Sequence, residues 1–227
     1  MDHRKDRLDQ FLSQMQPTGI QCQRVPAVNI KAENQSFSRI LETCFDNKVC
    51  PGRIGCQLSH LKALDFAIQR NLTRVIIFED DFVFQPFFHA SNLQPLVETV
   101  IQRHPGWDVL ALSISVDLEP GSETVVEGEP VFISPDGSKG VKTSIIHSAQ
   151  TSAGFMFRDS SVMKLYRSFI NQENCDIRLS DATGIDKCMK PMQKQSLWIG
   201  LKPQIGIQKP SFSDIEHMNV NYKLARR

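Results

Sequence analysis

The 227-residue sequence lacks several features that mark other classes of protein. No segment approaches the roughly 20 consecutive apolar residues that a membrane-spanning helix needs. Its 26 Lys and Arg residues nearly balance its 25 Asp and Glu residues, and no long run carries charge of one sign. Nucleic acid and anionic membranes are therefore not expected as main partners. No internal repeat or low-complexity linker divides the chain, so we expect a single domain over residues 1–227.

The six cysteines include no Cys-x-x-Cys pair. Cys44, Cys50 and Cys56 are evenly spaced, but a zinc site usually needs tighter pairs with further histidine or cysteine ligands. We therefore favour reduced structural thiols over zinc ligands or disulfides. No signal peptide is visible, because residues 1–16 are charged and amphipathic. A cytoplasmic location is expected, unless an upstream segment directs the natural chain to the ER or Golgi lumen.

The most informative stretch is an apolar run followed by three acids. Residues 75–78 predict a short strand buried on both faces, and Glu79, Asp80 and Asp81 follow at once. A buried carboxylate is unfavourable unless it is paired or binds a cation. Acids at the carboxyl end of a core strand usually face a crevice, where oxygen ligands select Mg²⁺ or Mn²⁺. Three acids that simply cap the strand and begin a turn explain the pattern equally well.

The remaining hydrophobic pattern predicts an α/β domain. Helices are expected at residues 4–15, from a turn at 51–55 to about 70, and at 86–104, 160–170 and 184–187. Strands are expected at 20–28, 107–112, 153–157, 196–201 and 204–208, with a loop and one or two hairpin strands at 115–150. An α/β domain normally opens with a core strand, whereas here a helix begins almost at Met1. The first strand is therefore expected to lie upstream of this sequence or to be missing.

The turn before the second long helix contains Gly52 and Gly55. Glycines at a helix N-terminus allow a backbone to approach phosphate, although an ordinary turn and amphipathic helix fit the pattern as well. His60 lies within this helix. A single helical histidine is more often structural than catalytic.

Several segments together resemble glycosyltransferase family 25, which contains lipopolysaccharide and procollagen galactosyltransferases. Residues 52–60 resemble its Gly-x-Ile-Gly-Cys-x-x-Ser-His signature, and residues 79–81 are similar to its Glu-Asp-Asp variant of the DxD metal motif. Residues 2–7 resemble its Asp-Arg-x-x-x-Arg segment. Weaker matches lie at residues 107–110, 151–155, 185–186 and 203–215. The sequence departs from the family in the missing first strand and in Phe155, where tyrosine is more frequent.

This resemblance implies a GT-A-like fold, with a Rossmann-type mixed central sheet flanked by helices. It implies a metal-dependent, inverting transfer of a sugar, most often galactose, from a UDP-sugar to a glycan, lipid-linked glycan or protein hydroxyl. The cofactor would be Mn²⁺ or Mg²⁺. Inversion proceeds through an oxocarbenium-like transition state, with a departing diphosphate whose charge must be stabilised.

The resemblance also implies roles for individual residues. Asp81 and Glu79 would contact the metal, and Asp80 would face the ribose or the donor sugar. The other donor-binding candidates are Arg4, Arg7, Ser59, His60, Gln208, Ser211 and Asp214. Inversion needs a base for the acceptor hydroxyl, for which Asp186 is favoured over Asp108 because it begins a short element after an irregular stretch.

Two other functions fit the same elements. A sugar nucleotidyltransferase would use a similar sheet, but it normally carries an early glycine-rich loop with a basic residue, which this sequence lacks. A non-catalytic glycan-binding or scaffold protein could retain the fold. The three intact acids at residues 79–81 argue against that alternative.

Overall fold

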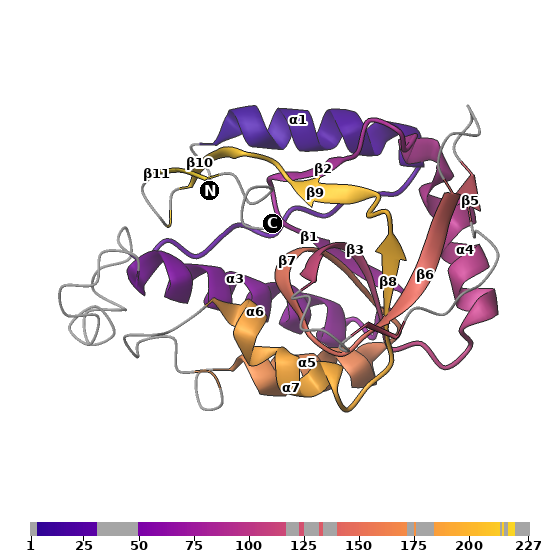
Figure 1. Cartoon of the computed structure of the whole chain (residues 1–227). Helices are drawn as coiled ribbons and strands as arrows, with labels where there is room; N and C mark the ends of the chain where they lie inside the picture. The colour runs from indigo at the N-terminus through magenta and orange to yellow at the C-terminus, as the bar shows by residue number, and fades with distance from the viewer. Residues whose placement is uncertain are drawn as a thin grey trace.

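The computed structural model describes residues 4–30, 50–116, 123–124, 132–133, 140–171, 175, 184–213, 215 and 218–220. These residues form a mixed central sheet with helices on both faces, which confirms the predicted α/β class (Figure 1). The finer GT-A assignment stays a prediction. None of the described helices combines the length and the apolar character needed to cross a lipid bilayer.

The described helices are α1 (Lys5–Met15), η1 (Gln16–Thr18), α3 (Cys50–Gln69), η2 (Ala90–Asn92), α4 (Leu93–Arg103), α5 (Ser160–Ile170), α6 (Ile185–Cys188) and α7 (Lys190–Gln193). The described strands are β1 (Val75–Phe78), β2 (Phe82–Phe84), β3 (Val109–Val116), β4 (Glu123–Thr124), β5 (Phe132–Ile133), β6 (Gly140–Ile146), β7 (Ala149–Phe157), β8 (Trp198–Lys202), β9 (Gly206–Gln208), β10 (Ser211–Ser213) and β11 (Met218–Val220).

The main sheet has the order β1-β7-β3-β8-β6-β4, with β5 paired to β6. Strand β7 runs antiparallel to both β1 and β3, whereas β3 and β8 are parallel. The carboxyl ends of β1, β3 and β8 therefore lie at the same edge of the sheet. Two small antiparallel pairs, β2–β9 and β10–β11, complete the pairing.

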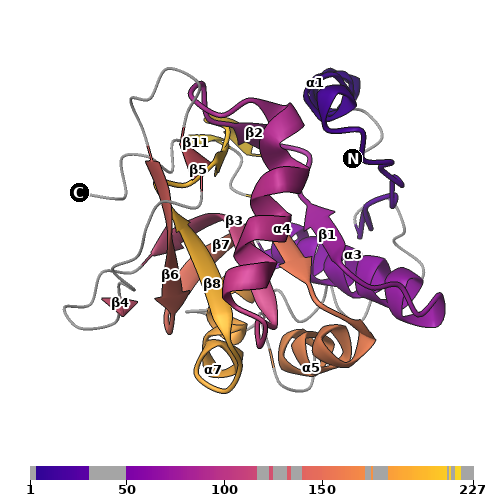
Figure 2. The same cartoon turned by 90° about the vertical axis from the view of Figure 1, so that its right-hand side faces the viewer.

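Strand β3 divides the core between the two faces of the sheet. Val109 and Ala111 belong to the apolar cluster formed with α3, α5, α6 and α7, while Leu110 and Leu112 belong to the cluster formed with α1 and α4. This alternation follows from the two-residue period of a strand. Figure 2 shows α4 crossing one face of the sheet, with α5 and α7 lying below it.

Most predicted elements are present, and the differences have physical causes. The strand predicted at residues 20–28 is wrong, because the described backbone there pairs with no strand and Val28 N donates instead to Ser59 Oγ at 2.9 Å. Residues 75–78 do form a strand, but each is only partly buried. Among the described residues β1 pairs on one side only, with β7, so it lies at the sheet edge and not in its centre.

Helix α3 begins at Cys50, so the predicted turn at residues 51–55 is the first part of the helix. Its glycines admit the protein's own backbone. A Cβ atom at Gly55 would lie 2.8 Å from the Val28 carbonyl oxygen, and one at Gly52 would lie 3.0 Å from Ile215 Cα. Their close neighbours are therefore other segments of the chain, which explains the glycines without any phosphate.

Candidate functional site

The acids after β1 meet an arginine from the start of the chain. Arg7, on α1, donates from Nη1 to Asp80 Oδ1 at 2.8 Å and lies 3.4 Å from Asp81 Oδ2. Its Nη2 donates to Ser211 Oγ and to the Phe212 carbonyl, each at 2.8 Å. One guanidinium thus joins residues more than 200 positions apart in the sequence. The guanidinium links helix α1 to the residues after β1 and to strand β10. Figure 1 shows α1 running above β10 and β1.

The pairing of β2 with β9 brings a further predicted residue to this place. Phe82 lies opposite Gln208, and Gln208 Nε2 donates to Asp81 Oδ2 at 3.2 Å. The Lys209 amide donates to the Asp81 carbonyl at 2.8 Å. The structure therefore brings together five of the predicted donor-site and metal residues: Arg7, Asp80, Asp81, Gln208 and Ser211.

Asp81 is the least well satisfied acid of this group. Its side chain is 11% exposed, and its Oδ1 atom is buried without a hydrogen-bond partner among the described residues. Burial raises the pKa of this carboxyl to about 7, with a further upward contribution from the Glu79 charge, although Arg7 and Gln208 oppose the shift. A buried carboxylate oxygen without a donor is unfavourable unless a proton or a cation occupies it. Asp81 therefore has the properties of a cation ligand.

A second group of side chains adjoins these acids. His60 Nε2 lies 3.3 Å from Glu79 Oε1, and Cys56 lies one helical turn before His60 on the same face of α3. Burial raises the pKa of the Cys56 thiol well above its usual value, and the charges of Glu79 and then Asp186 raise it further. Asp186 thus lies within electrostatic reach of Cys56, as do the three acids after β1. We call Glu79, Asp80, Asp81 and Asp186 the acid cluster.

Sequence reasoning missed Cys56 as a member of this site. The available signal was its four-residue spacing from His60, which places both side chains on one helix face. This spacing alone does not identify a site, because a third side chain from outside α3 is needed. Glu79 is that side chain, and it reaches Cys56 and His60 only through the packing of α3 against the end of β1.

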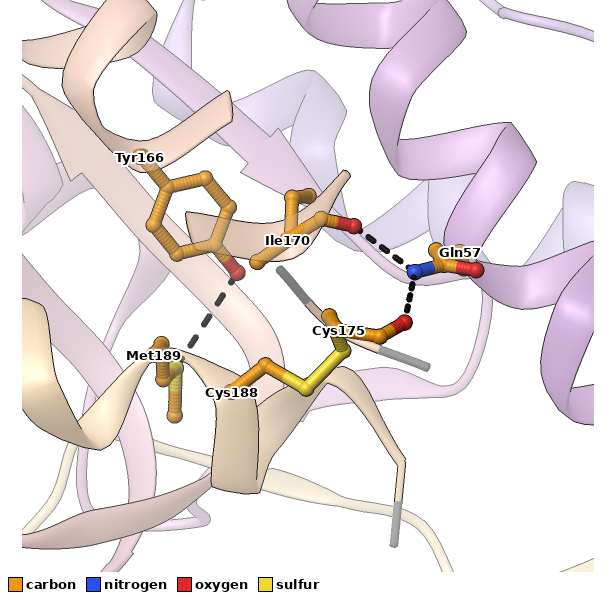
Figure 3. Close-up of a disulfide and its surroundings, with 6 residues drawn as sticks. All are labelled: Gln57, Tyr166, Ile170, Cys175, Cys188 and Met189. Atoms are coloured by element: carbon orange, nitrogen blue, oxygen red, sulfur yellow. Dashed lines mark hydrogen bonds between the residues drawn. A yellow bond between two sulfur atoms is a disulfide. The ribbon is translucent and has the colours of Figure 1, made fainter. Parts of the chain in front are cut away.

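Helix α6, which carries Asp186, is fixed by a disulfide between Cys175 and Cys188, with a Cα–Cα distance of 5.6 Å (Figure 3). Gln57 Nε2, from α3, donates to the carbonyls of Ile170 at 2.8 Å and Cys175 at 2.9 Å. Cys50 is disulfide-bonded as well, whereas Cys22 and Cys56 are free thiols. The prediction of reduced thiols throughout is therefore wrong, because only the fold brings together cysteines whose spacing shows no pattern.

Three predicted residues have other partners. Asp108 Oδ2 accepts from the Leu197 amide at 2.8 Å, and its Oδ1 lies 3.1 Å from Arg158 Nη2. Ser59 Oγ donates to the Gly55 carbonyl at 2.6 Å while it accepts from Val28. Arg4 makes two 3.0 Å hydrogen bonds to Asp6.

The sheet register separates Asp108 from the acid cluster. Val109 and Val75 both align with Phe157, whereas Phe78 aligns with Gly154. Asp108 therefore precedes the amino-terminal end of β3, more than three residues, or roughly 10 Å, from the level at which β1 ends. The last predicted site residue, Asp214, lies outside the described residues.

Comparison with known proteins agrees with the sequence motifs. The family profile described as "Glycosyltransferase family 25 (LPS biosynthesis protein)" matches residues 1–104. The resemblance to family 25 is confirmed. The matched range contains α1, α3 and the acids after β1, and therefore most of the polar side chains described above.

The matched relatives include proteins named as inactive members of glycosyltransferase family 25 and proteins named as procollagen galactosyltransferases. "Inactive glycosyltransferase 25 family member 3" of Mus musculus is 30% identical over 139 residues, which are 57% of this chain and 23% of that protein. The Homo sapiens protein of the same name is 37% identical over 82 residues, 36% of this chain and 13% of that protein. "Procollagen galactosyltransferase 1" of Danio rerio is 28% identical over 116 residues, 47% of this chain and 19% of that protein. The chain spans about a quarter or less of the length of these relatives.

Proposed function

We propose that this chain is a glycosyltransferase domain that moves a sugar, galactose in the first instance, from a UDP-sugar to a hydroxyl group of a glycan or glycoprotein. The observation that carries the proposal is the buried, unpartnered Oδ1 atom of Asp81 within the acid cluster. Family 25 resemblance supports the reaction class. The name of the procollagen galactosyltransferase relative supports galactose as the sugar.

The residues present fit a divalent metal ion. Asp81 and Glu79 would hold it, because carboxylate oxygens suit Mn²⁺ and Mg²⁺ and because Asp81 Oδ1 has no donor of its own. When bound, the ion would act as a Lewis acid toward the departing diphosphate. Asp80, at the same turn, is proposed to contact the ribose or the donor sugar. Gln208 holds Asp81 in position through the Oδ2 atom.

Arg7 is proposed to bind the diphosphate of the donor. Its guanidinium reaches the acid cluster and has a fixed fork of N–H donors that matches phosphate oxygens. Ser211 and the Phe212 carbonyl hold the other side of the fork. Arg4 is a second candidate for this role, and its Nε and Nη2 atoms donate to Asp6.

Asp186 is the proposed base for the acceptor hydroxyl. Inversion requires a group that accepts this proton, and Asp186 is the acid that α6 brings near the cluster. Its position depends on the disulfide at Cys188, two residues later. We do not propose Asp108 in this role, because its carboxylate is held by Leu197 and Arg158.

A second candidate function is a non-catalytic domain of the same fold. Two observations favour it: the most similar relatives quoted above carry "Inactive" in their names, and Arg7 already neutralises part of the acid cluster. Such a domain would bind a nucleotide sugar or a glycan without transferring the sugar. The two candidates differ in turnover and not in fold.

A thermal-shift panel of nucleotide sugars, with and without Mn²⁺, tests the proposal. We expect UDP-galactose with Mn²⁺ to stabilise the protein by about 2.7 kcal/mol when the ligand is at 100 times its dissociation constant. Asp81→Asn should remove the metal-dependent part of this shift. Asp108→Asn is the matched control and should retain it.

The outcomes separate the two candidates. Metal-dependent binding with release of UDP in the presence of acceptor supports the transferase. Binding without release of UDP, by transfer or by hydrolysis, supports the non-catalytic domain. An equal shift in wild type and Asp81→Asn, or no shift in either, would contradict the site itself.

The disulfide also bears on the compartment. Disulfides persist in oxidising compartments and are rare in the cytosol. The Cys175–Cys188 bond and the disulfide-bonded Cys50 therefore support a proposal of the ER or Golgi lumen over the cytoplasm that the sequence favoured. Measuring free thiols in the protein isolated without reductant from its natural source tests this location.

A further inference from the structure

Three side chains beside the acid cluster have a mixed set of donor atoms. The Cys56 sulfur, a His60 ring nitrogen and a Glu79 carboxylate oxygen all lie within 4.8 Å of one another. Cys56 and His60 are one turn apart on α3, and Glu79 follows β1, so two separate elements build the group. We call these residues the Cys-His-Glu triad.

We propose that the Cys-His-Glu triad is a binding site for a thiophilic divalent cation, with zinc the best fit. Mg²⁺ and Ca²⁺ prefer oxygen ligands, whereas thiolate and imidazole ligands select zinc among the common divalent ions. Three protein ligands leave the fourth tetrahedral position open to water or another molecule. Zinc binds the thiolate, so the Cys56 proton is released to solvent when the ion enters.

The geometry is close to that of a tetrahedral site. Ligand atoms about 2.0 to 2.3 Å from zinc lie roughly 3.3 to 3.8 Å from one another. His60 Nε2 and Glu79 Oε1 are already 3.3 Å apart. The widest separation in the triad is at most 4.8 Å, so a contraction of about 1 Å completes the site. His60 is nearly buried, with 8% of its side chain exposed, which limits the alternative positions of its ring.

The triad differs from the proposed donor-metal site in its chemistry. That site uses carboxylate oxygens of Asp81 and Glu79, whereas the triad adds sulfur and nitrogen, and Glu79 is common to both. Zinc in the triad would therefore withdraw Glu79 from the other ion and inhibit donor binding that depends on Mn²⁺. The inhibition rests on the proposed function, whereas the binding of zinc does not.

Cobalt and zinc titrations of the complete chain, with its disulfides intact and without added thiol, test the site. We expect one high-affinity ion per chain and, with Co²⁺, a near-ultraviolet charge-transfer band from the thiolate. Cys56→Ser should remove this band, and Cys56→Ser and His60→Gln should each weaken zinc binding beyond the 10- to 100-fold typical of outer-shell changes. Cys22→Ser is the matched control, because Cys22 is the other free thiol and is exposed.

The opposite results would overturn the inference. A wild-type protein without the cobalt band, or a Cys56→Ser variant that binds zinc as tightly as wild type, shows that the triad is not the ligand set. If Cys56→Ser does not fold, Glu79→Gln tests the same ligand set by zinc affinity. Asp81→Asn should keep the cobalt band while it loses binding of Mn²⁺ and UDP-sugar. If the wild-type protein without zinc shows no Mn²⁺-dependent donor binding, the proposed function is refuted, whereas the proposed zinc site is unaffected by that result.

Discussion

Asp108 and Asp81 lie at opposite ends of the central sheet and differ in how completely their carboxylate oxygens are paired. At the amino-terminal end of β3, Asp108 has a backbone amide on one oxygen and an arginine on the other. At the carboxyl end of β1, Asp81 shares Arg7 with Asp80 and has one oxygen with no partner among the described residues. Both acids were candidate site residues from the sequence.

The difference lies in the local balance of charge. Arg158 lies between Asp108 and Asp159, and backbone amides satisfy further oxygens of both acids. The acid cluster gathers four carboxylates, and Arg7 and, if protonated, His60 are cations that contact it. Asp81 Oδ1 still has no hydrogen-bond partner among the described residues, which is favourable only where a proton or a bound cation takes that place.

Breaking the Cys175–Cys188 disulfide should have the largest effect on stability. This disulfide fixes α6, which carries Asp186 of the acid cluster. Cys175→Ser combined with Cys188→Ser opens a loop with a sequence separation of 13, which should lower the free energy of unfolding by about 3 kcal/mol. Urea denaturation measures the change. Cys22→Ser is the control, and a double variant as stable as wild type would contradict the role of the disulfide in fixing α6.

Removing Asp108 should destabilise the other end. Asp108→Ala leaves the Leu197 amide without its acceptor and removes one acceptor of Arg158, which keeps Asp159, and we expect a loss of about 2 kcal/mol in the free energy of unfolding. Asp108→Asn keeps one acceptor oxygen and should lose less. Metal-dependent donor binding should persist in both variants. If it disappears in folded Asp108→Asn, the separation between the two ends does not hold.

Replacing Asp81 with a neutral residue should raise the free energy of unfolding, whereas replacing Asp108 should lower it. The folded protein raises the pKa of Asp81 from 3.8 to about 7, so the native state binds more protons than the unfolded state in that window. Stability from this group is therefore lost as the pH rises from about 4 to about 7. At pH 8 without metal, Asp81→Asn should be more stable than wild type by at least the roughly 1.4 kcal/mol that corresponds to one pKa unit.

Denaturation curves of wild type and Asp81→Asn across this pH range check the sign. The gap between the two proteins should widen as the pH rises, and saturating Mn²⁺ should close it by stabilising wild type alone. A variant that is less stable than wild type at pH 8 without metal would mean that Arg7 and Gln208 fully satisfy the carboxylate.

An exposed ion pair between α3 and α5 should have the smallest effect and serves as a baseline. Arg167 donates to Asp65 at 2.6 and 3.2 Å, which raises the pKa of Arg167, but both side chains are about 40% exposed. A double-mutant cycle should give about 0.5 kcal/mol, decreasing with added salt. A coupling as large as the expected effect of Asp108→Ala would contradict the expectation that exposure to solvent weakens this ion pair.

The sequence by itself determined the local elements and the reaction class worth testing. The apolar period predicted α1, α4, α5 and the core strands, because burial of one face imposes a repeat on the chain. The helix predicted at residues 160–170 begins after Asp159, whose carboxylate accepts from Ser161 N and Val162 N. The family motifs and the acids after residue 78 pointed to the same part of the fold.

Only the tertiary structure decided which polar groups meet. The segment at residues 20–28 has the apolar content of a strand, yet it contacts α3, where the Val28 amide donates a hydrogen bond to Ser59 Oγ. The Cys175–Cys188 bond, the contact of Arg7 with Asp80 and the approach of Glu79 to Cys56 and His60 all join segments that no local pattern connects. Local periodicity records which face of each element is apolar, whereas the partners of a charge depend on how those faces pack.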